Sequence, residues 1–204
     1  MTGTMLLVSC GPKALTLPEE PIDRAATCGV VAANSARLAT SDIQAPLSFE
    51  AMGRIVHYPL LAGSAGESFS SELAAKAQSR MTELQEGISE AKWQELIPQC
   101  RVAFPATALE EVKLPADDFD AQLGCVELGD FLRSALEEQA EYGNELSEYR
   151  AFSTKREASL ASWLRNRAGP ALQDRVAERH RALAAMAKAG PPIIVMSECL
   201  ARFD

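Results

Sequence analysis

The sequence predicts an all-α fold, built as two similar helical lobes of about four helices each and held by disulfide bonds. Alanine, leucine, glutamate and arginine are abundant, whereas aromatic residues make up only 6% of the chain, and this balance favours helices over sheets. Apolar residues recur at helical spacing, and long runs with period-two alternation are missing. Hydrophobic residues at 47% and charged residues at 24% match an ordinary globular domain.

The first lobe, residues 22–104, is expected to hold four helices. Their predicted starts lie near residues 22, 48, 70 and 89. In the third helix, Leu73, Ala77, Met81 and Leu84 form one apolar stripe. We expect Pro59 to interrupt or bend the second helix and Pro98 to kink the fourth, since proline lacks the N–H that a helix interior needs.

Residues 105–118, with two prolines, are interpreted as a linker to a second lobe that spans residues 119–204. Its first helix, over residues 119–141, places leucines every four residues on one inward stripe. Gly169-Pro170 is a strong stop and restart signal. The remaining helices are predicted over residues 145–167, 171–188 and after Gly190-Pro191-Pro192.

The two halves of the sequence align as an internal repeat. With a shift of 97 residues, Asp23 and Cys28 fall on Asp120 and Cys125, and each aspartate is placed to cap the helix that carries the cysteine. With a shift of 99 residues, Cys100 falls on Cys199 and the interior positions align as well. The aligned interior pairs are Leu47 with Leu146, Leu73 with Leu172, Lys76 with Arg175, Arg80 with Arg179 and Leu84 with Leu183. We therefore interpret the chain as a duplicated unit of roughly 85 residues.

The repeat predicts how the four cysteines pair. If each unit once folded alone, the bonds lie within the units, which gives Cys28–Cys100 and Cys125–Cys199. Each bond would join the first helix of a lobe to its last. The alternative is a Cys100–Cys125 bond across the linker together with Cys28–Cys199. Four separate cysteines in a reduced cytoplasmic protein are a further alternative.

The net charge of −8 and the pI near 4.9 argue against general affinity for nucleic acid or anionic membranes. The charge is unevenly distributed along the chain. Residues 110–148 contain twelve acidic and two basic side chains, whereas residues 150–181 contain eight basic and three acidic ones. This segregation predicts either complementary faces on neighbouring helices or a basic docking surface for an acidic partner.

The first 21 residues indicate export. Leu7-Val8-Ser9-Cys10 follows a short apolar run, and it resembles the lipobox of bacterial lipoproteins, in which the protein is cleaved before the cysteine and the cysteine is lipidated. That resemblance covers about six residues and implies lipidation of Cys10. Residues 11–21 contain three prolines and are interpreted as a tether. We expect a periplasmic protein that meets the membrane only through this lipid anchor.

Catalytic, metal and cofactor motifs are not found in the sequence. Gly63-Ser64-Ala65-Gly66 lacks the first glycine of a nucleophile elbow, and the cysteines lack metal-ligand spacing. His57 and Tyr58 are candidate pocket residues beside the bend at Pro59, although a packing role is the simpler interpretation. His180, between two arginines, is interpreted as helix surface. No cofactor is expected.

These observations favour a non-catalytic protein of the cell envelope that binds a protein partner. An immunity or inhibitor protein against a secreted enzyme is one specific version. A small-molecule or lipid carrier with a cavity between helices is the first alternative. A hydrolase with a site around His57 is the second.

Overall fold

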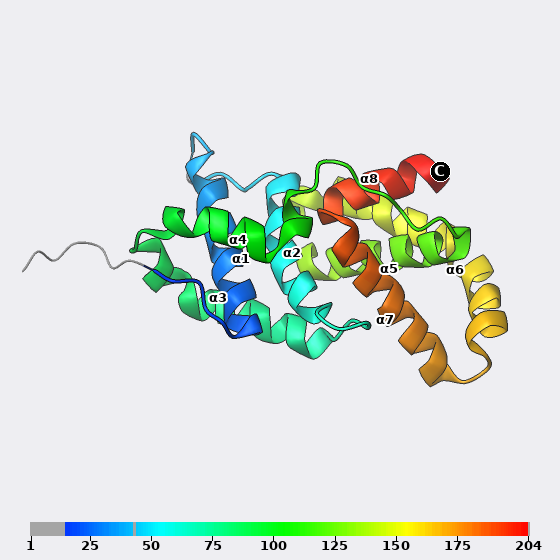
Figure 1. Cartoon of the computed structure of the whole chain (residues 1–204). Helices are drawn as coiled ribbons and strands as arrows, with labels where there is room; N and C mark the ends of the chain where they lie inside the picture. Colours follow the sequence, from blue (N-terminus) through cyan, green and yellow to red (C-terminus); the bar gives the residue numbers. More distant parts are fainter. Residues whose placement is uncertain (1–14, 43, 204) are drawn as a thin grey trace, which may run out of the picture.

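The computed structural model describes residues 15–42 and 44–203, and its regular secondary structure in these ranges is helical (Figure 1). The all-α prediction is confirmed. Three short 3₁₀ helices, Trp93–Leu96, Pro105–Ala108 and Ala140–Tyr142, accompany the α-helices. The eight α-helices of the described ranges are α1 Pro21–Leu38, α2 Phe49–Gly63, α3 Ser71–Ser89, α4 Ile97–Ala103, α5 Asp118–Leu136, α6 Gly143–Ala168, α7 Leu172–Ala189 and α8 Pro192–Phe203.

The first unit is a three-helix arrangement of α1, α2 and α3 with α4 laid against it. A disulfide joins Cys28 of α1 to Cys100 of α4, with a Cα–Cα distance of 5.4 Å. Serine side chains cap the N-termini of α2 and α3. Ser48 Oγ accepts a hydrogen bond from Ala51 N–H, and Ser70 Oγ accepts one from Leu73 N–H. The buried core around the disulfide consists of Val30, Val31, Tyr58, Ile88, Trp93 and Leu96.

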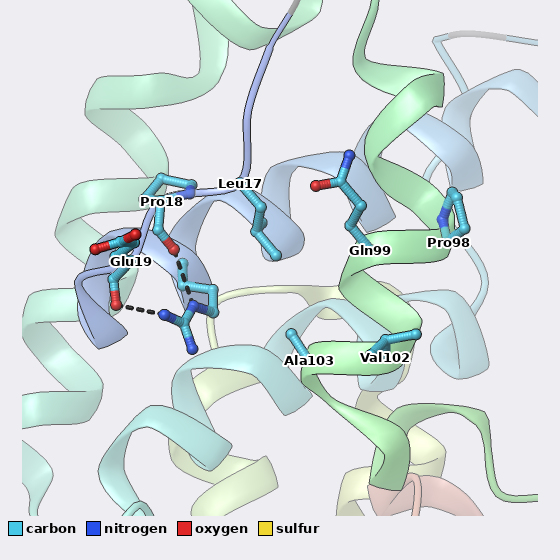
Figure 2. Close-up of a pocket in the computed structure, with 8 residues that line it drawn as sticks. Leu17, Pro18, Glu19, Pro98, Gln99, Val102 and Ala103 are labelled. Carbon is cyan, nitrogen blue, oxygen red and sulfur yellow. Dashed lines mark hydrogen bonds between the residues drawn. The ribbon is translucent and has the colours of Figure 1, made fainter.

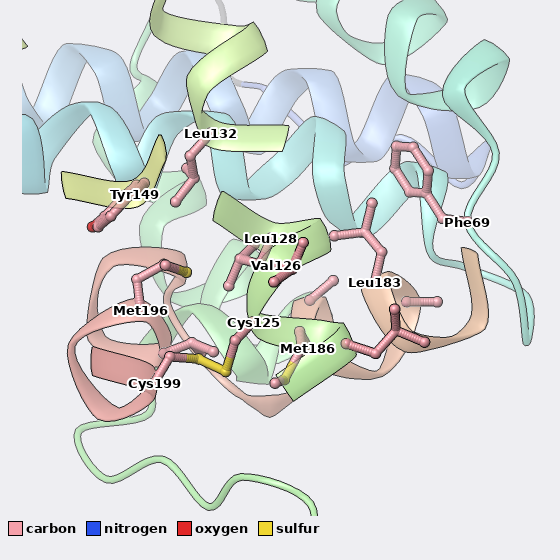
Figure 3. Packing of buried hydrophobic residues seen from close by; sticks show 14 of the residues in the cluster. Phe69, Cys125, Val126, Leu128, Leu132, Tyr149, Leu183, Met186, Met196 and Cys199 are labelled. Carbon is pink, nitrogen blue, oxygen red and sulfur yellow. A yellow bond between two sulfur atoms is a disulfide. The ribbon is translucent and has the colours of Figure 1, made fainter. Parts of the chain in front are cut away.

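The second unit is centred on α5, which packs against α6, α7 and α8. Its disulfide joins Cys125 of α5 to Cys199 of α8, with a Cα–Cα distance of 5.8 Å. Both predicted cysteine pairs are therefore present. The predicted leucine stripe of α5 runs through this core, where Leu128 and Leu132 are 0% exposed (Figure 3). Leu136, one turn further on, is also 0% exposed.

The predicted helix caps were wrong by three residues in both units. Glu20 and Asp117 cap α1 and α5, and their carboxylates accept from the N–H groups of Asp23 and Asp120 at 2.7 and 3.0 Å. Asp23 and Asp120 therefore lie inside the first turn. An acidic side chain there still interacts favourably with the positive end of the helix dipole. The shift of 97 residues between the two units holds for the true caps as well.

Neither of the two prolines expected to disturb helices interrupts the α-helix that contains it. Pro59 lies inside α2, which continues to Gly63 because Tyr58, Pro59 and Leu60 are all buried among the neighbouring helices. Pro98 lies in the first turn of α4, where backbone N–H groups have no acceptor within the helix, so the lack of an N–H costs no hydrogen bond. It therefore starts a short helix and does not kink a long one.

The two units share one continuous core. Leu60 of the first unit packs in the cluster formed around α5, as do Phe69 and Ala74. Gly53 of α2 allows Ile193 of α8 to approach the helix backbone, because a Cβ at Gly53 would clash with the isoleucine side chain. The lobes are thus joined by α2, which lies against α5, α7 and α8. We call the whole contact between the two units, including the segments that flank α2, the seam.

The segment between the units is held to the second unit. Val112 and Leu114 pack against its core. Arg202 of α8 donates to the carbonyl of Pro115 at 2.7 Å and pairs with Asp118. The residues predicted as a linker therefore form part of the folded body.

Among the described residues, no individual helix is long and apolar enough to cross a bilayer. The pair α7 and α8 would satisfy the length and composition requirements together, and it is bent by 110°.

Candidate functional site

The helical hairpin of α6 and α7 extends away from the shared core (Figure 1). Its turn is formed by Gly169-Pro170-Ala171, and Gly169 has a φ of 87°, a backbone conformation that side-chain-bearing residues rarely adopt. Neither α6 nor α7 has a side-chain hydrogen bond at its N-terminus. The hairpin is thus specified by its turn and by apolar packing, which on α6 reaches Leu164 near the turn.

The apolar stripe of α7 continues beyond the part that the core covers. Leu183 and Ala187 are buried in the core at 5% and 1% exposure. Val176 and Leu172 lie about two and three turns before Leu183 on the same helix, and they are 40% and 68% exposed. A stripe of this kind is normally covered along its whole length. The free end of α7 is therefore an apolar surface without a partner in the described chain.

A tryptophan adds apolar area to the same hairpin. Trp163 of α6 is 42% exposed, and its ring lies 5.8 Å from that of Phe119. Arg167 lies over the Phe119 ring, 5.0 Å from its centroid, and pairs with Asp117 and Asp120 at 3.1 and 3.3 Å. These contacts fix the end of α6 to the start of α5. They leave one side of Trp163 open to solvent.

Only some of the basic side chains in residues 150–181 form ion pairs with acidic side chains of a neighbouring helix. Arg167 pairs with the acidic start of α5, and Arg179 of α7 pairs with Glu127. Burial raises the pKa of the Glu127 carboxyl, although Arg179 acts to lower it. Arg165 and Arg175 form no ion pair within the described ranges. These two arginines and the exposed Asp174 lie on the same hairpin as the exposed apolar residues, and we call Trp163, Arg165, Leu172, Arg175 and Val176 the hairpin surface.

A second surface feature is a shallow groove between the segment that precedes α1 and the outer side of α4 (Figure 2). Its volume is about 480 Å³, and Val102, at 82% exposure, lies along it. Arg24 folds the preceding segment back by donating to the carbonyls of Pro18 and Glu19. The remaining lining residues are Leu17, Pro98, Gln99 and Ala103.

The two candidate pocket residues, His57 and Tyr58, are buried and contact different parts of the molecule. His57 is 0% exposed, and its Nε2 lies 2.8 Å from the carbonyl of Ala187 across the seam. Tyr58 is 7% exposed and packs edge-on against Phe104, with 5.4 Å between ring centroids. Neither residue lines the groove or the hairpin surface. Burial lowers the pKa of His57 to about 4, so the ring is neutral at pH 7.

The other residues considered in the sequence have structural contacts. His180 is only half-buried against Phe69, with 6.2 Å between ring centroids. Trp93 is buried at 6% exposure in the first unit. Asp117 acts as a helix cap. Cys10 and its lipobox lie outside the described residues.

Within residues 15–42 and 44–203, no group of three or more histidine, cysteine or acidic side chains is arranged to hold a metal ion.

Leu172 and Val176 were not recognised as surface residues in the sequence. Their spacing continues the buried stripe of α7, so periodicity alone predicts a buried position for both. The length of the neighbouring helices decides how much of the apolar stripe of α7 is buried.

Comparison with protein-family models, with curated proteins and with solved structures finds no match to this chain.

Proposed function

We propose that this protein is an exported, non-catalytic module of the cell envelope that binds an acidic protein partner through the hairpin surface. The observation that carries the proposal is the apolar stripe of α7, which continues to the exposed Leu172 and Val176. The same hairpin carries Arg165 and Arg175, which have no ion pair in the described chain. Exposed aromatic and apolar groups flanked by arginine are typical of protein interfaces. The partner should offer apolar side chains surrounded by carboxylates.

Charge supports this choice of partner. The chain carries a net charge of −8, yet residues 150–181 carry five more basic than acidic side chains. At physiological salt, electrostatic attraction is screened beyond about 8 Å. The charges of the hairpin therefore affect an approaching partner more than the net charge of the whole chain does. A carboxylate-rich surface would associate faster with this hairpin than with the rest of the molecule.

The proposal is tested by placing a photo-crosslinking amino acid at Leu172 in the full-length protein, expressed in the envelope of its cell. We expect one discrete crosslinked product after irradiation. The matched position is Leu38 at the end of α1, which is similarly exposed at 70% and lies in the other unit. We expect no product from that position.

The double variant Arg165→Glu with Arg175→Glu should reduce the crosslinked product at least tenfold, because it replaces attraction by repulsion. Neither arginine has an ion pair to lose within the described chain, so folding should be unchanged. Equal products from the two crosslinker positions, or no effect of the double variant, would refute the proposed docking surface.

Export is the second part of the proposal. Two disulfides are consistent with an oxidising, extracytoplasmic compartment. We place the protein in the periplasm, tethered through a lipid on Cys10, and we interpret the two units as products of a gene duplication. Metabolic labelling with an alkyne fatty acid tests the tether. The label should be present in the wild type and missing from Cys10→Ala.

A second candidate function is a carrier for a small apolar molecule. The groove beside α4 favours it, since its lining includes Val102, Leu17 and two prolines. Native mass spectrometry of the protein purified from the envelope should then detect a bound molecule. Val102→Asp should remove that molecule without changing the crosslinked product at Leu172.

A further inference from the structure

The buried imidazole of His57 connects the two units at a point where α7 has a free carbonyl group. The carbonyl of Ala187 would ordinarily accept from the N–H of residue 191, but that residue is proline and has no N–H. His57 supplies the missing donor from α2, with 2.8 Å between Nε2 and the Ala187 oxygen. The contact joins residues 130 positions apart in the sequence.

The geometry of this contact also fixes the proton on the ring. A carbonyl oxygen only accepts, so Nε2 must carry the proton, and Nδ1 of the neutral ring is then an acceptor. Nδ1 is buried and has no hydrogen-bond partner among the described residues. A second proton would be placed on this atom, where no group receives its hydrogen bond.

We infer that His57 is a pH-sensitive latch between the two units. In its neutral form the imidazole holds α2 to the end of α7, and protonation at Nδ1 in acid expels it and opens the seam. The Cys28–Cys100 and Cys125–Cys199 bonds lie within the units and do not cross the seam. Each bond therefore keeps the first and last helix of its unit joined while the seam opens.

The surroundings of His57 support this assignment. Its pKa is lowered to about 4, first by burial, while the hydrogen bond to Ala187 acts in the opposite direction. No charged side chain is among the causes of this shift. Several ionisable groups of the elements packed on α2 have contacts of their own: Asp23 of α1 with Arg80 of α3, Glu127 of α5 with Arg179 of α7, Lys188 of α7 with the Gly66 carbonyl, Arg202 of α8 with Asp118, and His180 of α7 with the Phe69 ring.

The direction of the pH effect follows from the lowered pKa. In the open state the ring binds a proton with a pKa near 6.5, whereas in the closed state it does so only near pH 4. The closed seam is therefore fully favoured above pH 6.5 and loses stability as the pH falls toward 4. Between pH 7 and 4.5 the equilibrium should shift toward opening on the order of fifty-fold.

Hydrogen exchange of the oxidised full-length protein tests the latch. The N–H of Phe69 donates to the carbonyl of His180 across the seam at 3.0 Å and reports on its opening. Its protection factor, corrected for the intrinsic pH dependence of exchange, should fall on the order of fifty-fold between pH 7 and 4.5. Amides in the middle of α5, beside Leu128, should keep their protection and report on the second unit.

Three variants distinguish titration of His57 from a general weakening of the seam. His57→Gln keeps a donor but does not titrate, so the pH response of the seam should vanish. Tyr142→Phe removes another seam bond, from the Tyr142 hydroxyl to the Leu47 carbonyl at 2.5 Å. It should lower protection equally at both pH values. His180→Gln should leave the response intact, although His180 lies at the same seam.

The latch is wrong if wild type and His57→Gln lose seam protection equally, or if α5 loses protection together with the seam. A second measurement uses the wild type alone, so it does not depend on whether a variant folds. Nitrogen-15 signals of His57 should show a neutral ring protonated at Nε2 at pH 6. A positively charged His57 at that pH would also overturn the inference.

Discussion

The two units have the same disulfide arrangement but differ in their second helix. In each unit the bond joins the first helix to the last, with Cys28 and Cys125 on the long central helices α1 and α5. The second helix has 15 residues in the first unit and 26 in the second. The additional turns of α6 keep Leu160 and Leu164 buried in the core, at 1% and 2% exposure, and leave Trp163 between them 42% exposed. A shared framework can thus hold an additional surface where one helix outgrows its neighbours.

The starts of α3 and α7 show the same difference on a smaller scale. Ser70 caps α3, and Ala74 and Ala77 in its first two turns are buried. Ala171 gives α7 no side-chain cap, and Leu172 at its start is exposed. The first unit uses its third helix for the core from the beginning. The second unit leaves Leu172 and Val176, in the first two turns of its third helix, exposed.

The largest expected effect comes from removing either disulfide. Replacing Cys28 and Cys100 by alanine, or Cys125 and Cys199 by alanine, should lower the free energy of unfolding by about 4 kcal/mol each, because each bond closes a loop of similar length. Urea denaturation measures both losses. A loss below about 1 kcal/mol for one pair would show that the two disulfides are not equivalent.

The next largest effect concerns the core that the two units share. Leu60 of α2 is 0% exposed and packs in the core of the second unit. Leu60→Ala should lower the free energy of unfolding by about 3 kcal/mol, through lost burial and the cavity left behind. Leu38→Ala, at 70% exposure, should change it by less than about 0.5 kcal/mol. At pH 7, where the seam is closed, a single unfolding transition should persist, and two separate transitions at that pH would contradict a shared core.

The pH dependence of unfolding should also depend on the seam. The pKa of His57 is lowered from 6.5 to about 4 by burial, so the unfolded chain binds a proton before the folded chain does. Wild-type stability should therefore fall by about 3 kcal/mol relative to His57→Gln as the pH decreases from 6.5 to 4. Urea denaturation at several pH values measures the difference. Parallel curves for the two proteins would exclude a contribution from His57.

The smallest effect concerns the helix starts. Ser70→Ala removes the cap of α3 and should cost about 1 kcal/mol. Ala171→Ser offers α7 the cap it lacks and should add about 0.5 to 1 kcal/mol. Thermal unfolding of both variants compares them directly. If both changes destabilise the protein, the missing cap does not make the start of α7 less stable than the start of α3.

Several features of the fold could be predicted from local sequence. Helical spacing and the stops at Gly169-Pro170 and Gly190-Pro191-Pro192 located the last three helices of the second unit closely, whereas α5 ends at Leu136, before the predicted end at residue 141. The register of the cysteines predicted both pairs. The caps were misplaced because Asp23 and Asp120 are as suitable chemically as the true caps three residues earlier. The effect of Pro98 was also misjudged, since proline starts a helix as readily as it bends one.

The sequence by itself determined the all-helical class and the pairing of the cysteines, because spacing along one chain encodes helix periodicity and cysteine register. Only the tertiary structure decided that His57 meets Ala187 and that Leu172 and Val176 remain uncovered. The same apolar stripe is core or surface depending on how far the neighbouring helix extends. How far the neighbouring helix reaches depends on the packing of the whole chain, and it cannot be deduced from the residues of the stripe alone.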